Sequence, residues 1–409
     1  MIESPLDYLA SAYGNVVRYD ATGNAAGIFV KFPKMKSSEL VSGLPAFSHP
    51  AFIINGAEQD YILLGKYPCG TDSEASPKLI SAPNIEPAYR MYASDMYLAI
   101  RRAGSGISGM TIADYGFIKL LAQKMGWTNR GNNYYGASLQ DGAAWVVNAN
   151  YAVNTKRHYR GWMYKCLQAH TSSVAYRPDM APAYWEKLNF VGGMTNGKIE
   201  VEDRQTSYHT LNGTGPKEWY LGNDLASMAD LVGNVGEMQY GYRLVNNEIQ
   251  IMQNNDAADP SAYIIGDGAA WKAIMPNAIN ESYTLVEPGT EGTLHWNWTG
   301  SAIQLDTQCD DTSNERRETF FKDITAHPTR LPYVPVIMKL LGLFPTDAND
   351  TTPGYISIPF SNDGLPLYAY RGGSYLNYGT NIYGLGHLYH INLWSRGMIY
   401  GSRPRALAE

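Results

Sequence analysis

The sequence predicts an α+β fold with two main helices and many short antiparallel strands. Two segments carry helical periodicity, over residues 111–125 and 334–343. Between them, short apolar or alternating runs are separated by Gly, Asn and Pro, which is typical of strands joined by turns. Internal repeats, heptads and low-complexity linkers are absent from the sequence.

The helix over 111–125 has clear signals at both ends. Thr111 and Asp114 have the spacing of a capping box, and Gly126 follows the last apolar position. In the second helix, Pro335 stands at an early position and Gly342 near the end. We also expect a helix after Asp224, through LASMADL.

Strands are expected in most of the remaining chain. Residues 28–35, 51–67 with a turn at Asn55-Gly56, NNEIQIMQ, TLHWNWTG and the stretch 356–373 have this character. Residues 1–24 are too few to form a core, so we expect an N-terminal arm that contacts another subunit or a particle component. Residues 25–409 then form one elaborated domain, with insertions over about 127–225 and 240–330.

Composition excludes several classes of function. The 409 residues carry a net charge of −6 without a basic cluster, which argues against nucleic acid as a partner. The three cysteines, Cys69, Cys166 and Cys309, are too widely spaced for a ligand pair or a disulfide framework. The first residues lack the basic and apolar regions of a signal peptide, so we expect synthesis in a bacterial cytoplasm without membrane insertion.

Motifs of catalysis are weak or absent. Gly104-Ser-Gly106-Ile-Ser-Gly109 matches a dinucleotide fingerprint but lacks the preceding apolar strand. His387 and His390 do not have the spacing of helical metal ligands, and the acidic run 306–318 does not fit an EF-hand loop. We therefore expect a protein that is not an enzyme and has no cofactor, with a structural calcium ion left open.

The C-terminal segment 371–409 has the composition of a binding surface. It is rich in Tyr, Asn, Ser and Gly and contains no Lys, Asp or Cys. Tyrosine offers a large, rigid contact area, whereas Ser, Gly and Asn offer adaptable hydrogen bonds. A packed core would need a buried partner for each of these polar groups. An irregular, glycine-rich subdomain is the alternative interpretation.

Two motifs indicate a family. Asp230–Met238 (DLVGNVGEM), and Arg371-Gly-Gly-Ser followed by Gly401-Ser-Arg-Pro404, resemble the signatures of the formylglycine-generating-enzyme branch of the C-type lectin fold. The resemblance implies a C-type-lectin-like fold over most of residues 25–409. It also implies structural roles for Asn234, Glu237, Arg371, Gly372, Gly373 and Arg403. On physical grounds we expect the two arginines to tie the ends of the C-terminal segment together through charge-assisted hydrogen bonds to backbone or to Glu237.

Within this branch, the chain is most similar to variable proteins of diversity-generating retroelements, of the phage major-tropism-determinant type. The catalytic cysteines of the oxidase members are missing near RGGS, since Cys309 is the last cysteine. The resemblance implies a phage receptor-binding protein that binds a host-surface protein or glycan. It further implies a homotrimer at a tail-fibre tip of the virion, beside other tail proteins. The alternatives are an oxidase relative and a glycan-binding bacterial surface lectin.

The variable segment is expected over about 371–405, with residues that face outward to contact the ligand. Trp394 is expected to be fixed but part of the surface, because its codon does not arise by adenine-directed mutagenesis. The expected contact residues are Tyr375, Asn377, Tyr378, Asn381, Tyr383, His387, Tyr389, His390, Asn392, Trp394, Ser395, Tyr400 and Ser402.

Overall fold

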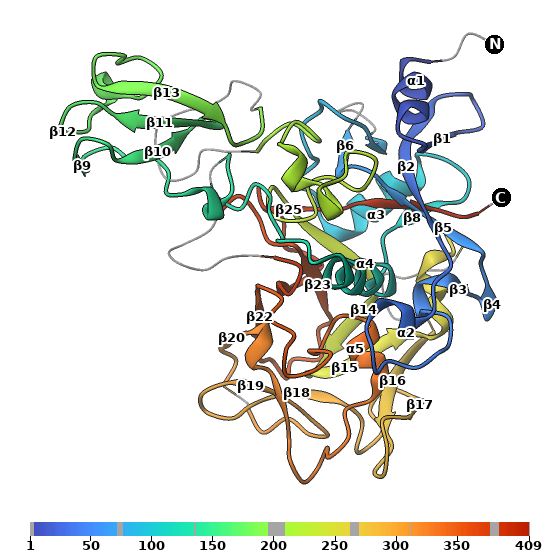
Figure 1. Cartoon of the computed structure of the whole chain (residues 1–409). Helices are drawn as coiled ribbons and strands as arrows, with labels where there is room; N and C mark the ends of the chain where they lie inside the picture. Colours follow the sequence, from blue (N-terminus) through green and yellow to red (C-terminus); the bar gives the residue numbers. More distant parts are fainter. Residues whose placement is uncertain are drawn as a thin grey trace.

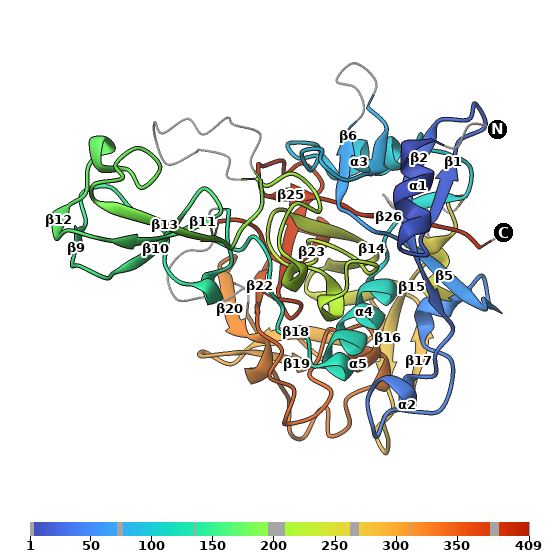
Figure 2. The same ribbon diagram turned by 45° about the horizontal axis from the view of Figure 1, so that its top comes forward.

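A computed structural model describes residues 4–71, 77–134, 136–194, 209–261, 270–311, 313–376 and 384–408. Two sheets, of seven and twelve strands, form the main body, and the helices pack on and between them (Figure 1). A small group of strands, β9 to β13, projects from one side of this body in both views (Figures 1 and 2). The predicted α+β class is confirmed, and the narrower assignment to the C-type lectin fold stays a prediction.

The longest helix lies where it was predicted. The Thr111 hydroxyl accepts a bond from the Asp114 amide (3.1 Å), the Asp114 carboxylate accepts one from the Thr111 amide (2.9 Å), and Gly126 ends the helix with φ of 62°. The helix at 334–343 is confirmed in a shorter form. The helices are α1 (Pro5–Ala12), α2 (Ser37–Leu40), α3 (Ala93–Arg101), α4 (Ile112–Met125) and α5 (Val336–Leu340).

The helix expected after Asp224 is wrong. The Asp224 carboxylate accepts a hydrogen bond from the Ala226 amide (2.9 Å), which closes a turn instead of starting a helix. Only a short 3₁₀ segment, Leu221–Asn223, precedes this turn. Conversely, α3 was not predicted, although Met96 and Ile100 on its buried face follow a helical spacing.

The seven-stranded sheet brings the two ends of the chain together. Its order is β6-β7-β2-β5-β26-β8, with β1 paired to β2, so the C-terminal strand lies between β5 and β8. The predicted hairpin at Asn55-Gly56 is confirmed as a separate pair, β3 (Ile53–Ile54) and β4 (Ala57–Glu58). The strands of the sheet are β1 (Val16–Tyr19), β2 (Ala25–Pro33), β5 (Tyr61–Gly65), β6 (Cys69–Thr71), β7 (Leu79–Ser81), β8 (Ile107–Gly109) and β26 (Pro404–Ala406).

The twelve-stranded sheet follows the order β20-β22-β24-β23-β14-β15-β18-β19-β21, with β16, β17 and β25 attached at its side. Most pairs are antiparallel, but β24 runs parallel to β22, β25 to β14, and β21 to β19. Its strands are β14 (Gly236–Val245), β15 (Glu248–Met252), β16 (Trp271–Pro276), β17 (Tyr283–Val286), β18 (His295–Trp298), β19 (Ile303–Asp306), β20 (Arg316–Phe320), β21 (Thr325–Ala326), β22 (Tyr355–Pro359), β23 (Leu367–Arg371), β24 (Leu388–Asn392) and β25 (Tyr400–Gly401).

The beginning of the chain does not stand apart from the rest. Strand β1 pairs with β2 in antiparallel register, and Leu6 and Leu9 of α1 pack against a small apolar cluster that includes Ile28 and Tyr67. Residues 4–19 therefore belong to the main fold, and a separate arm is not observed over this range.

One buried arginine connects the two sheets. Arg403 precedes β26, and its Nε and Nη2 donate to the carboxylate of Glu237 on β14, at 2.9 and 2.6 Å. Its Nη1 donates to the carbonyls of Gly65 (3.0 Å) and Lys66 (2.9 Å), and Nη2 also donates to that of Ala229 (2.8 Å). Every N–H direction of the guanidinium thus has an acceptor, which is the condition under which a buried charge is tolerated.

We expect Arg403→Met to lower the free energy of unfolding by about 3–5 kcal/mol, because it leaves the Glu237 carboxylate buried without its partner. Chemical denaturation followed by circular dichroism measures this loss. Arg396→Met is the matched control on the same segment, where an exposed arginine is removed at a cost of at most about 1 kcal/mol. Equal losses in the two variants would contradict the role given to Arg403.

Candidate functional site

The motif residues at the start of the C-terminal segment have the structural roles that were expected of them. The Arg371 guanidinium is buried and its Nη2 donates to the carbonyls of Gly342 (2.8 Å) and Leu385 (3.0 Å). Gly372 has φ of 80°, and a Cβ atom there would lie 2.5 Å from the Leu231 carbonyl oxygen, so only glycine fits. Gly373 has φ of 77°. The expected bonds of Arg371 to backbone and of Arg403 to Glu237 are confirmed.

Asn234 has the structural role that its motif implied. Its φ is 60°, a left-handed conformation that asparagine tolerates. The Asn234 Oδ1 accepts from Asn132 Nδ2 (3.0 Å) and from the Thr210 amide (2.9 Å), and its Nδ2 donates to the Thr210 carbonyl (2.9 Å). This side chain therefore fastens two distant loops to the start of β14.

Four of the expected contact residues lie in the interior, so the prediction that they face outward is wrong. Tyr375, His390 and Ser402 are fully buried, and His387 is nearly so. His390 lies on β24, which is paired on both sides, with β22 and with β23. Its two ring nitrogens lie 3.0 Å from the Ser357 carbonyl and 3.0 Å from the Tyr242 hydroxyl. These four side chains are therefore part of the packed interior of the C-terminal segment.

Other expected contact residues remain accessible. Trp394 is 74% exposed on the loop after β24, with its ring 6.5 Å from that of Tyr92. Asn392 and Ser395 are partly buried, and the Asn392 Oδ1 accepts from the Trp394 amide (3.1 Å) and the Ser395 hydroxyl (2.9 Å). These two residues therefore build the turn that presents Trp394.

Two further expected residues, Tyr389 and Tyr400, line a cavity of about 300 Å³, together with His387. Their rings lie 6.1 Å apart. Asn377, Tyr378, Asn381 and Tyr383 fall outside the residues that the structure describes.

A second candidate site lies on the projecting β-module, which we define as residues 144–194. Its sheet has the order β10 (Lys156–Tyr159), β11 (Trp162–Cys166) and β13 (Trp185–Phe190), and β9 (Asn150–Tyr151) pairs with β12 (His170–Thr171). Its own core consists of Tyr151, Tyr159, Tyr164, Cys166, Ala181 and Trp185. An isolated bridge between Ala137 and Gly192 holds the entry and exit of the module together.

The module carries a partly exposed group of rings that we call the aromatic patch, formed by His170, Tyr176 and Tyr184. Tyr176 is 36% exposed and its ring lies 4.5 Å from that of Tyr184, which in turn lies 4.9 Å from His170. Trp185 of the module core anchors the backbone of the patch, because its Nε1 donates to the Tyr176 carbonyl (3.0 Å). Exposed rings fixed on a rigid base are suited to contact an apolar face of a ligand.

Sequence reasoning missed this module, since residues 127–225 have weak periodicity. A usable signal was present: the stretch 144–186 holds three tryptophans and five tyrosines at short intervals, namely Trp145, Tyr151, Tyr159, Trp162, Tyr164, Tyr176, Tyr184 and Trp185. Strands of two to six residues are too short for their periodicity to be visible.

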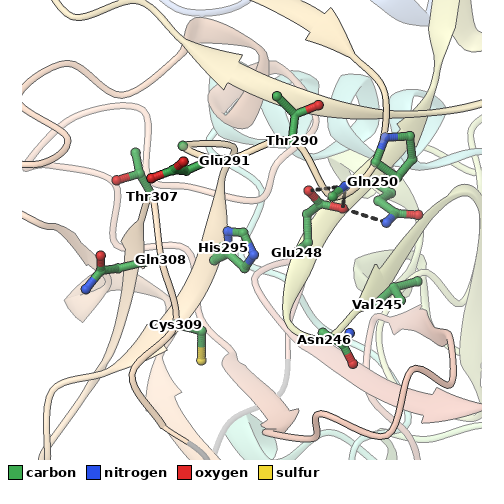
Figure 3. A pocket seen from close by; sticks show the side chains of 13 residues that line it. Val245, Asn246, Glu248, Gln250, Thr290, Glu291, His295, Thr307, Gln308 and Cys309 are labelled. Carbon is green, nitrogen blue, oxygen red and sulfur yellow. Dashed lines mark hydrogen bonds between the residues drawn. The ribbon is translucent and has the colours of Figure 1, made fainter.

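A cavity of about 500 Å³ opens beside β15 and β18 (Figure 3). The buried Glu248 carboxylate accepts from Gln250 Nε2 (2.7 Å), the Gly289 amide (3.0 Å) and the Thr293 hydroxyl (2.6 Å). Glu248 therefore holds the loop 288–293 in place. Burial raises the pKa of the Cys309 thiol at the edge of this cavity to about 11, so the reactive thiolate is scarce near neutral pH.

Within the described ranges, His, Cys, Asp and Glu form no group of three or more that could hold a metal ion. In that same part of the chain, the helices are too short or too polar to cross a lipid bilayer.

Comparison with known proteins finds a likeness for the module. Residues 144–186 match carbohydrate-binding module family 5/12. A segment of 44 residues is 43% identical to chitinase A1 of Niallia circulans. This segment is 11% of the present chain and covers 6% of the length of that relative. The family match is therefore local to the projecting module, and it suggests carbohydrate binding.

The burial of His390 predicts a pH dependence of stability. Burial lowers the pKa of its imidazole to about 3, whereas an exposed histidine titrates near 6.5. The unfolded chain therefore binds more protons between these values, so the stabilisation is complete above pH 6.5 and is lost as the pH falls toward 3.

We expect His390→Gln to reduce the loss of unfolding free energy between pH 7 and pH 5 by about 2 kcal/mol relative to the native chain. Urea denaturation at the two pH values measures the difference. Parallel losses in variant and native protein would show that His390 is not kept neutral by burial.

Proposed function

We propose that this protein binds a glycan through the projecting module and does so without catalysis. The observation that supports this most strongly is the coincidence of three features over one stretch of chain. The match to carbohydrate-binding module family 5/12 covers residues 144–186, and the same residues form a module with its own core. The module also presents the aromatic patch to solvent.

The chemistry of the aromatic patch suits a saccharide. A sugar ring has an apolar face of C–H groups, which a tyrosine ring covers with little loss of torsional freedom. Polar groups border the rings: Gln168 is exposed and its Nε2 donates to the Ala183 carbonyl (3.1 Å), which leaves its own carbonyl oxygen as an acceptor. Arg177 pairs with Asp179 at the other side (3.1 Å).

We propose chitin as the first glycan to test, because the relative that matches a 44-residue segment of this chain is named a chitinase. Contacts at one small patch give weak binding, and a polymer that engages several copies or several sites raises the avidity. An insoluble β-linked polymer is therefore a more sensitive probe than a single free sugar.

A narrower proposal concerns biological context. We propose that the glycan lies on a bacterial host surface and that the rest of the chain is a lectin-like scaffold of the phage tropism type, in a homo-oligomer. The support is that the two motifs behind this resemblance meet in space, through Arg403 and Glu237. The buried positions Tyr375, His390 and Ser402 then belong to the frame, and Tyr389, Trp394 and Tyr400 remain for contact.

For glycan binding, we expect Tyr176→Ala to reduce retention of the full chain on chitin beads at least tenfold, which corresponds to about 1.4 kcal/mol. The melting temperature should hardly change, because the ring is not part of the core. Tyr333→Ala, which removes an exposed tyrosine of the main body, is the matched control and should bind like the native chain. Native retention of the Tyr176 variant would reject the aromatic patch as the binding surface.

For the tropism proposal, the locus in sibling isolates should contain a reverse transcriptase and a near-copy of the segment, with substitutions concentrated between residues 374 and 402. Sequencing of these isolates measures both. An invariant segment in a locus without the reverse transcriptase would reject diversification and would leave glycan binding by the module untouched.

A further inference from the structure

The cavity of about 300 Å³ beside the C-terminal segment is built from several parts of the chain. Strand β22 pairs with β20 on one side and with β24 on the other, and β23 follows next in the sheet. Residues of all four strands line the cavity, together with residues of the C-terminal segment itself, such as Gly373 and Ile399. No residue of the projecting module contributes to it.

A guanidinium is held at the edge of this cavity. Arg316 on β20 is exposed, yet its Nη1 donates to the Ser357 hydroxyl (2.9 Å) and its Nη2 to the His390 carbonyl (2.9 Å). The same group lies 4.0 Å from the centre of the Tyr389 ring. Two hydrogen bonds and a ring contact fix its orientation, and three N–H donors remain for a ligand.

A carboxylate stands next to it. Glu318 is two residues further along β20, on the same face of the strand as Arg316. Ser357 connects the pair, since its hydroxyl accepts from Arg316 and donates to Glu318 Oε1 (2.9 Å). The cavity therefore offers fixed donors and a fixed acceptor side by side, with charges that cancel.

Tyrosine rings form much of the remaining wall, from Tyr355, Tyr370, Tyr389 and Tyr400. The rings of Tyr370 and Tyr400 lie 4.9 Å apart. Tyr370 is buried, and its hydroxyl has no hydrogen-bond partner among the residues that the structure describes. A buried hydroxyl without a partner is costly, so a ligand that supplies one would be favoured there.

We propose that this cavity binds a single uncharged saccharide residue, as a second site separate from the module. Adjacent hydroxyls of a sugar ring can bond Arg316 and Glu318 together, while the tyrosine rings cover its C–H face. Because the two charges cancel, the cavity has no net preference for a phosphate or an ammonium group. This proposal shares the class of ligand with the glycan binding proposed for the module, and it uses none of the module's residues.

The test is an NMR titration of the full chain with free glucose, galactose, mannose and N-acetylglucosamine, observed by saturation transfer. We expect at least one of these sugars to bind, and Arg316→Gln and Glu318→Gln each to weaken its binding at least tenfold. The matched controls are Arg317→Gln on the same strand and Glu315→Gln at the residue before it. These two side chains pair with each other (2.6 Å) and lie on the opposite face, so they should leave binding unchanged.

The outcomes separate this site from the module. Tyr176→Ala should reduce retention on chitin and leave sugar binding at the cavity intact, whereas Arg316→Gln should do the reverse. The proposal fails if none of the four sugars binds, or if Tyr176→Ala abolishes their binding while the Arg316 and Glu318 variants retain it. Neither failure would reject glycan binding by the module. Melting temperatures of the variants show whether each remains folded.

Discussion

The bond between Arg403 and Glu237 is the interaction on which the main body depends. It joins a strand of the twelve-stranded sheet to the stretch that leads into the seven-stranded sheet, and the same guanidinium binds the backbone beyond β5. Arg405, two residues later, lies 3.4 Å from Asp114 in the first turn of α4. The end of the chain thus connects both sheets and the central helix, and the buried charge of Arg403 is tolerated because acceptors surround it.

Short motifs in the sequence predicted several features of the main body. The Thr111 and Asp114 capping box, the Asn55-Gly56 hairpin and the DLVGNVGEM and RGGS motifs each act through a few neighbouring atoms, and the structure contains them as expected. Composition was less reliable for the site. Tyr375, His390 and Ser402 have the polarity of contact residues, yet long-range contacts bury all three, and Tyr242 and Ser357 satisfy His390. No local pattern reveals that kind of partner.

Two glycan sites of different construction follow from the two proposals. The module has an open aromatic patch on short strands, suited to a long polymer that passes across it. The cavity near β20 and β22 has a charged pair and tyrosine walls, suited to one sugar residue. Because they lie on different parts of one chain, a glycan that reaches both would bind more tightly than either site allows alone.

Hydrogen–deuterium exchange of the full chain, with and without a soluble oligomer of N-acetylglucosamine, tests the central claim most directly. Glycan binding by the projecting module predicts slower exchange in peptides from residues 144–186, centred on the chain around His170, Tyr176 and Tyr184. Unchanged exchange throughout that stretch at saturating oligosaccharide would contradict it.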